Sequence, residues 1–159
     1  MPDNLYLWSP HNVQRVRASG IESDADFSAD FGMIRTWVHA SYAFTKSIDQ
    51  TQGGSVYGEQ LPYVPLHKGI IGANVTFKKA SLGYSQVFTG ARATSAEHTE
   101  ILPSFSTGRL VMGYEFIAQH FTIDFQFKID NIWDIEYQVI QYYRNPGRAF
   151  SVGLNVKIK

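Results

Sequence analysis

The chain has 159 residues, no cysteine and a formal net charge of zero, which excludes disulfide frameworks, thiolate chemistry and a basic surface for nucleic acid. Charged residues make up 18% of the chain, below the roughly 25% typical of soluble domains, while aromatic residues make up 14%. This balance favours a β-barrel with aromatic girdles at its membrane interfaces. No apolar run approaches the roughly 18 residues of a transmembrane helix, and residues 1–10 lack the pattern of an export signal.

Two-residue alternation of apolar and polar side chains predicts an all-β protein, an antiparallel meander of about seven long strands. The clearest alternation lies in the last two strands. The expected strands cover, in chain order, about Val13 to Phe31, Met33 to Thr45, Lys68 to Phe77, Ala80 to Phe88, Thr107 to Ile117, Phe121 to Ile129 and Phe150 to Lys159.

The sixth expected strand has a purely apolar side, which consists of Phe121, Ile123, Phe125, Phe127 and Ile129. Polar residues such as Asp124 and Lys128 fall on its other side, because successive side chains alternate between the faces of a strand. The same alternation would suit a soluble sandwich, so it does not decide whether the apolar side meets a core or lipid.

The predicted connectors alternate strictly between short and long. Tight turns are expected near Gly32, at residues 78–79 and at residues 118–120, and long loops at about residues 46–67, 89–106 and 131–147. All long loops therefore lie at one end of the sheet. This segregation is typical of outer-membrane barrels with short periplasmic turns and long extracellular loops, and a soluble sandwich has no reason to show it.

The segment before the last strand carries a distinctive set of residues: Asn131-Ile132-Trp133-Asp134, then Tyr137, then Pro146-Gly147-Arg148. It resembles the closing segment of a TonB-dependent outer-membrane receptor, in which an Asn-aromatic-Asp turn, a Tyr and a Pro-Gly-Arg precede the final barrel strand. Further stretches are similar to wall strands and loop frames of these receptors. They are Trp8-Ser9-Pro10, Gly20-Ile21-Glu22, Tyr63-Val64-Pro65-Leu66-His67, Gly90-Ala91-Arg92 and Leu102-Pro103.

The resemblance implies that residues 1–159 form the C-terminal portion of a transmembrane receptor barrel, with the plug domain and the earlier strands absent. The implied function is nutrient uptake of the iron-siderophore, haem or cobalamin class in the bacterial outer membrane, with no enzymatic activity and no cofactor. The implied partners are outer-membrane lipid, the remainder of the barrel and plug, a small nutrient ligand, and TonB only through the absent plug. One departure is the end of the chain, Ile158-Lys159, where many such barrels have an aromatic residue.

Three aromatic residues of the expected outer loops, Tyr57, Tyr63 and Phe105, are candidates for ligand contact, and they would serve equally as interface anchors or loop packing. Structural roles are expected for Asn131, Trp133, Asp134, Tyr137, Pro146, Gly147 and Arg148. Trp133 and Tyr137 should pack near the wall. Gly147 should need a backbone conformation that a side chain disfavours, and the Arg148 guanidinium should bind nearby carboxylates.

Metal and catalytic sites are not predicted. Four carboxylates share one side of the first expected strand and are interpreted as lumen-facing charges rather than ligands of a hard cation: Glu22, Asp24, Asp26 and Asp30. No pair of histidines has metal-ligand spacing among His11, His39, His67, His98 and His120. No nucleophile motif of the Gly-x-Ser-x-Gly type occurs.

Two alternatives remain open from the sequence. A small self-contained outer-membrane barrel or pore would need an even strand number and closure of the first strand on the last. A soluble antiparallel barrel that binds an apolar ligand would need the side formed by Phe121 to Ile129 to point inward. We expect neither of these. The expected structure is an open, curved seven-stranded sheet whose two edges expose unpaired backbone groups.

Overall fold

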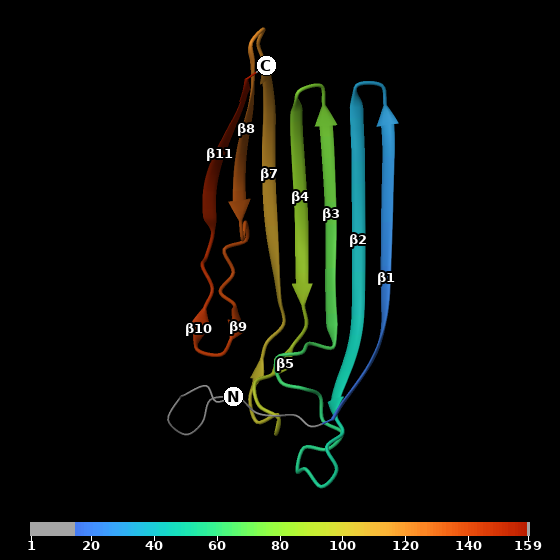
Figure 1. Ribbon diagram of the computed structural model, residues 1–159. Coiled ribbons are helices and arrows are strands. Elements are labelled where there is room, and N and C mark those ends of the chain that lie inside the picture. The colour runs from blue at the N-terminus through green and yellow to red at the C-terminus, as the bar shows by residue number, and fades with distance from the viewer. Residues whose placement is uncertain (1–14, 159) are drawn as a thin grey trace.

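The computed structural model describes residues 15–158, and in that range it contains strands and turns but no helix. Seven long strands form one antiparallel sheet in the order β1-β2-β3-β4-β7-β8-β11 (Figure 1). They are β1 (Val16–Phe31), β2 (Ile34–Asp49), β3 (His67–Phe77), β4 (Ala80–Thr89), β7 (Phe105–Ile117), β8 (Phe121–Asp130) and β11 (Ala149–Ile158). Two small hairpins lie in the loops: β5 (Arg92–Ala93) with β6 (Ile101–Leu102), and β9 (Gln138–Ile140) with β10 (Tyr143–Arg144).

The seven predicted strands are confirmed, with small differences at their ends. β2 continues to Asp49, four residues beyond the predicted end at Thr45, because residues 46–49 remain paired with β1 although their apolar alternation has faded. β7 begins at Phe105 rather than Thr107 because it pairs with the end of β4 at Thr89. Residues 1–14 and 159, which include the predicted start of the first strand at Val13, His11 and Trp8-Ser9-Pro10, lie outside the described residues.

The strand registers carry one apolar face across the whole sheet. Val152 lies opposite Phe127, and Phe127 lies opposite Met112. Met112 in turn lies opposite Leu82, and Leu82 opposite Val75. Directly opposed residues of an antiparallel pair point to the same side, so every strand contributes its apolar alternation to the same face. We call this side the apolar face and the other the polar face.

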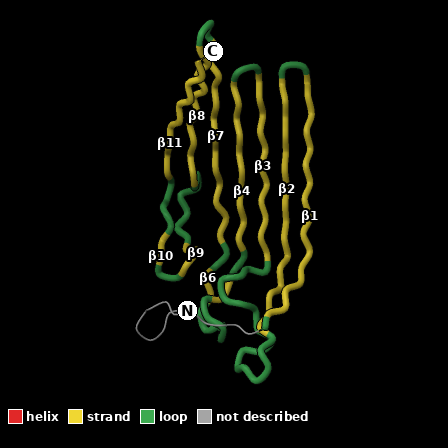
Figure 2. The backbone as a smooth tube through the Cα atoms, in the orientation of Figure 1, coloured by secondary structure: helices red, strands yellow, loops and turns green. Residues whose placement is uncertain are grey.

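The tight turns and the long loops lie at opposite ends of the sheet (Figure 2). The short connections between β1 and β2, β3 and β4, and β7 and β8 share one end. The long loops, residues 50–66, 90–104 and 131–148, share the other. The predicted segregation of the connectors is confirmed.

The sheet is open in the described part of the chain. β1 and β11 are its two edges, and an odd number of antiparallel strands makes these edges run in the same direction. Direct closure of β11 on β1 would therefore require a parallel ladder. Antiparallel closure would require an odd number of additional strands between the two edges.

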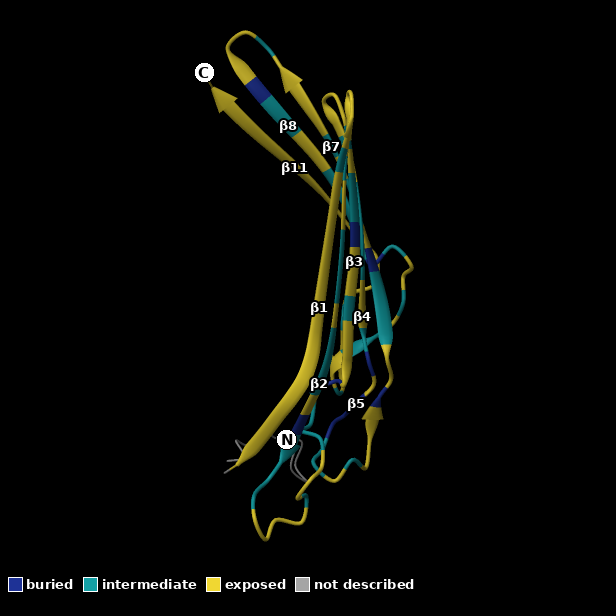
Figure 3. Ribbon diagram, turned by 90° about the vertical axis from the view of Figure 1, so that its right-hand side faces the viewer, coloured by how far each residue is buried: buried dark blue, intermediate teal, exposed yellow. Residues whose placement is uncertain are grey.

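No second layer covers either face of the described sheet, so large apolar side chains are exposed along it (Figure 3). Ile21 is 70% exposed and Val152 is 66% exposed. The only buried hydrophobic residues in residues 15–158, Ala93 and Leu102, lie in the loop 90–104. A sheet is stable only when its apolar face is covered, so this one requires lipid or protein against it. The described residues include no helix long and apolar enough to cross a membrane.

Candidate functional site: the interlocked long loops and the polar face

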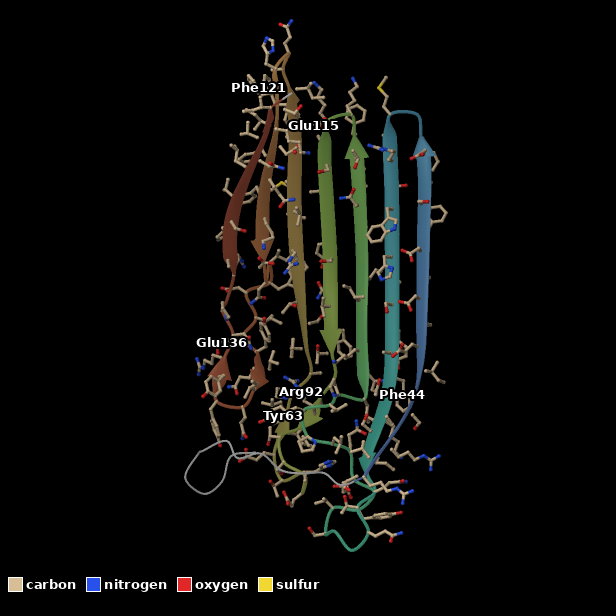
Figure 4. The ribbon with its side chains drawn as sticks, in the orientation of Figure 1. Phe44, Tyr63, Arg92, Glu115, Phe121 and Glu136 are labelled. Atoms are coloured by element: carbon tan, nitrogen blue, oxygen red, sulfur yellow. The ribbon has the colours of Figure 1, made fainter. Side chains whose placement is uncertain are left out.

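Arg92 lies at the centre of the long loops and is only 5% exposed (Figure 4). Its guanidinium donates to the backbone carbonyls of Gln138 and, at 3.3 Å, Val139 in the loop 131–148. It also lies over the Phe105 ring, 5.2 Å from the ring centroid. Burial lowers the pKa of the Arg92 guanidinium, which nonetheless remains a cation, since arginine does not lose its proton in proteins. One charged side chain therefore joins two of the three loops.

The third loop, residues 50–66, is held against the same centre. The backbone N–H of Tyr63 donates to the Ala93 carbonyl at 2.8 Å, and Tyr63 has a left-handed backbone with φ of 61°. Burial raises the pKa of the Tyr63 hydroxyl, an effect partly offset by a backbone hydrogen bond at Gln141 and by the charge of Arg92. Loop 90–104 thus contacts both of its neighbours.

Two further contacts reinforce this arrangement. A ring nitrogen of His98 lies 2.7 Å from the Gln60 carbonyl, and its other ring nitrogen lies 3.5 Å from the Glu59 carboxylate. On the opposite side, the Gln141 amide donates to the Glu100 carboxylate. The three long loops form one hydrogen-bonded layer over the end of the sheet rather than three independent segments.

The turn that follows β8 is organised by Asn131, which is buried and has a left-handed φ of 49°. Its side-chain amide donates to the Ile135 carbonyl at 2.9 Å and accepts from the Ile135 N–H at 3.2 Å. Asparagine tolerates the left-handed region and can satisfy both backbone groups at once. Asn131 therefore closes the turn onto Ile135.

Asp134 connects this turn to the start of the last strand. Its Oδ1 accepts from the backbone N–H of Arg148 at 2.8 Å, and a Cβ on Gly147 would lie 2.8 Å from the same oxygen. The φ of Gly147 lies outside the left-handed region, so the structure does not show the expected backbone conformation that a side chain disfavours. A side chain at position 147 would instead have to displace the Asp134 carboxylate, which accepts from the Arg148 N–H. The contact of Arg148 with this carboxylate is made by its backbone N–H, and the expected role of its guanidinium stays a prediction.

The loop 131–148 places Trp133 and Tyr137 on opposite faces of the sheet. The Trp133 indole N–H donates to Gln86 at 3.0 Å, and a Cβ on Gly108 would lie 2.7 Å from the same indole nitrogen. Gln86 and Gly108 belong to the apolar face by register. Tyr137 instead packs on Phe105, a polar-face residue, with ring centroids 4.5 Å apart. Both aromatic residues therefore lie against the wall, and the loop straddles its rim.

The three candidate contact residues do not form one cluster. Tyr63 and Phe105 both border Arg92, whereas Tyr57 is 58% exposed at the tip of the loop 50–66. Phe105 is the first residue of β7 and packs between Arg92 and Tyr137. This arrangement fits a role of Phe105 in loop packing. Arg92 was noticed in the sequence only as part of Gly90-Ala91-Arg92, and its central position was missed.

The polar face carries several cross-strand ion pairs that the sequence did not single out. Arg109 binds Asp130, and the Lys128 ammonium lies 3.0 Å from the other oxygen of that carboxylate. Nearer the tight turns, Lys157 lies 3.3 Å from Asp124. These charges occupy alternate positions on neighbouring strands, as the registers require.

The predicted acidic row is exposed on the polar face of β1, at Glu22, Asp24, Asp26 and Asp30. Asp26 pairs with His39 at 3.0 Å. His67 instead meets the Tyr42 hydroxyl at 2.7 Å. Within residues 15–158 no three acidic, histidine or cysteine side chains are arranged to hold a metal ion.

The fold matches those of solved transport receptors. The crystal structure of the ferric citrate transporter FecA in its unliganded form aligns with a TM-score of 0.78 at 20% identity, and covers 89% of this chain and 24% of that one. The ferric preacinetobactin receptor BauA from Acinetobacter baumannii aligns with a TM-score of 0.63 at 14% identity, and covers 89% of this chain and 26% of that one. The chain spans about a quarter of the length of these structures.

The sequence also matches a family model. The model describes the β-barrel of TonB-dependent receptor-like proteins, and it matches residues 1–132, most of the chain. Proteins of this family are transporters and receptors rather than a class of enzymes, and their barrels lie in the outer membrane. The chain belongs to the TonB-dependent receptor-like β-barrel family.

Proposed function

We propose that this chain supplies the C-terminal wall strands and three outer loops of a bacterial outer-membrane uptake receptor. The nutrient would belong to the iron-siderophore, haem or cobalamin class. The two similar solved structures are receptors or transporters of ferric chelates, which favours the first of these. In this proposal the apolar face meets lipid, the polar face lines the lumen, and the long loops face the outside.

The observation that carries the proposal is the combination of a single-layer sheet with segregated connectors. One face is apolar on all seven long strands, while every long loop lies at one end. Lipid would cover the apolar face along its whole height, and a water-filled or plug-filled lumen would solvate the polar face. A water-soluble domain would leave this apolar face exposed unless another layer packed on it.

The wall would be completed by the rest of the receptor. The parallel direction of β1 and β11 disfavours self-closure, and therefore disfavours the alternative of a small self-contained barrel. The plug and its contact with TonB would belong to that other part. The role of this chain is then to hold the ligand at the outer mouth with its interlocked loops, while energy-coupled rearrangement of the plug releases it inward.

The test is uptake of radiolabelled ferric chelate by cells that express the receptor containing this chain. We expect uptake to stop when a protonophore is added, while ligand binding at the cell surface persists. Replacement of the three long loops by short turns should abolish binding and uptake but leave the wall assembled. Uptake that is indifferent to both treatments would refute the proposal.

A further inference from the structure

A concavity of about 370 Å³ opens on the polar face, next to the long loops. Its walls include Ile70, Val87, Arg109, Asp130, Tyr137 and Pro146. This volume falls within the range of about 300–1,000 Å³ found for small-molecule sites. It takes residues from five long strands, β3, β4, β7, β8 and β11, and from the loop 131–148, so the segment from Asn131 to Gly147 forms part of its wall.

The formal charges of the two charged lining residues, Arg109 and Asp130, cancel, but a second cation, Lys128, lies beside them. Asp130 accepts from the Arg109 guanidinium with one oxygen and pairs with the Lys128 ammonium through the other. Two cations thus share one carboxylate, which leaves one net positive charge. Arg109 lies directly opposite Asp130 on the neighbouring strand, and Lys128 lies two residues before Asp130 on the same face.

The Arg109 guanidinium is held in a way that leaves its outer edge available. Its Nε binds Asp130, and within residues 15–158 the structure shows no acceptor for its two Nη groups. The side chain is 57% exposed. Asp130 therefore holds the guanidinium through Nε, which leaves the fork of N–H donors on the two Nη groups without an acceptor among these residues. This fork matches the two oxygens of a carboxylate or phosphate group.

The remaining walls suit the apolar body of a ligand. Ile70 and Val87 lie side by side on neighbouring strands, and Pro146 belongs to the turn into β11. The Tyr137 ring is fixed by its contact with Phe105. Apolar walls with a few convergent polar groups are the usual composition of a small-molecule site, and they strengthen charged hydrogen bonds by excluding water.

We propose that this concavity is a subsite for an anionic small molecule, whose carboxylate or phosphate group binds the Nη edge of Arg109 beside Lys128. The inference rests on the proposed uptake function, and it assigns a charge class to the ligand at the outer mouth. Asp130 orients Arg109 and also weakens the positive field. Arg109 and Asp130 should therefore affect anion affinity in opposite directions.

The test measures binding to the purified receptor that contains this chain, by titration calorimetry. The probes are propane-1,2,3-tricarboxylate, inorganic phosphate and the neutral trimethyl ester of the tricarboxylate. We expect at least one anion to bind more tightly than the ester, and its affinity to fall as salt is added. The better of the two anions identifies the group that the subsite prefers.

Three variants separate binding from structure. Arg109→Gln should weaken anion binding by about tenfold or more, the usual loss for a charged hydrogen-bonded pair. Asp130→Asn should retain or increase the affinity. Lys68→Gln, which removes another cation from the polar face outside this concavity, should change it by no more than about twofold because solvent screens it.

Three results would overturn the inference: no anion binds better than the ester, Arg109→Gln binds like the unchanged receptor, or Asp130→Asn weakens binding as much as Arg109→Gln. The last result would mean that the ion pair only supports the wall. Uptake of ferric chelate by the same variants keeps the two proposals apart. Normal energy-dependent uptake together with any of these results would refute the anion subsite and leave the proposed function intact, whereas no uptake by the unchanged receptor would refute the function.

Discussion

Replacement of Arg92 by methionine should loosen the loops 90–104 and 131–148, which this side chain joins, and with them the loop 50–66, which is bonded to the neighbouring Ala93 carbonyl. Methionine keeps an apolar stem of similar length and removes only the guanidinium. Two carbonyls of the loop 131–148, those of Gln138 and Val139, lose a charged donor. Each such hydrogen bond contributes about 1.5–3 kcal/mol. The contact with the Phe105 ring adds about 0.5–2 kcal/mol.

An opposing effect reduces this sum. The guanidinium is buried, and the direction of its pKa shift shows that burial disfavours the charged form. Removal of the charge therefore recovers part of the desolvation cost. We expect a net loss of about 2–4 kcal/mol for the closed arrangement of the loops, with little change in the strands far from them.

Hydrogen exchange on the membrane-assembled protein measures this loss directly. The amides of Tyr63 and Asn145 are informative because their acceptors, the Ala93 and Tyr137 carbonyls, lie within the loop layer. A loss of about 2–4 kcal/mol should speed their exchange by about 30- to 700-fold. Amides between β3 and β4 should exchange at an unchanged rate and serve as the internal reference.

The matched control is Arg144→Met in the loop 131–148. Arg144 pairs with Glu136 at 3.5 Å, but both side chains are exposed, at 75% and 83%. Exposed ion pairs contribute about 0–1 kcal/mol, so this variant should leave the Tyr63 amide protected. The reasoning fails if Arg92→Met leaves both amides unchanged, or if Arg144→Met exposes them equally.

Three further predictions concern the wall, the rim and the loop layer. Phe125→Arg should impair membrane assembly by about 2–4 kcal/mol if the residue lies mid-membrane, whereas Asp124→Ala should assemble. Heat-modifiable mobility on gels measures assembly, and normal assembly of the arginine variant would contradict a lipid-facing side. Gly147→Val should damage assembly and surface display more than ligand affinity per assembled receptor, because its Cβ would meet Asp134. Gly147→Ala combined with Asp134→Ala should recover part of the loss. Surface labelling and binding counts measure these effects, and intact assembly with abolished binding would place the segment in the binding site. The raised pKa of Tyr63 predicts that the loop layer is stable below the usual tyrosine pKa of 10.0 and loosens as the pH rises through the pKa of the folded state, because Tyr63 releases its proton more easily in the unfolded loop. Tyr63→Phe should remove this pH dependence of hydrogen exchange. An identical alkaline response of both proteins would contradict the prediction.

The sequence predicted the sheet well because the period-2 alternation is a direct imprint of which face each residue occupies. Phe127, Met112 and Leu82 fall on one face in the registers, as their parity within each strand required. The end of β2 was placed too early because residues 46–49 are held by backbone pairing with β1, which leaves no trace in side-chain polarity.

The loop layer could not be predicted in the same way. Arg92 is separated from Gln138 by 46 residues, and it binds backbone carbonyls, which any residue type provides. Gly147 was singled out in the sequence, but the feature that the structure shows there, the close approach of the Asp134 carboxylate, was not predicted, and it is the reason why a side chain at 147 would disturb the turn. That reason depends on where the left-handed residues Asn131 and Asp134 place a carboxylate, and the local sequence of the Pro-Gly turn does not contain this information.

The most direct test of the whole account is a single-cysteine scan along β8 in the membrane, to which the cysteine-free sequence of this chain adds no background. Spin labels would be placed at Ile123, Asp124, Phe125, Gln126, Phe127 and Lys128. Their collision rates with lipid-soluble oxygen and with a water-soluble nickel chelate would then be compared. We predict strict alternation, with oxygen favoured at Ile123, Phe125 and Phe127 and the nickel chelate favoured at the three residues between and after them. Uniform accessibility, or alternation of the opposite sign, would contradict a lipid-facing apolar side and with it the barrel wall.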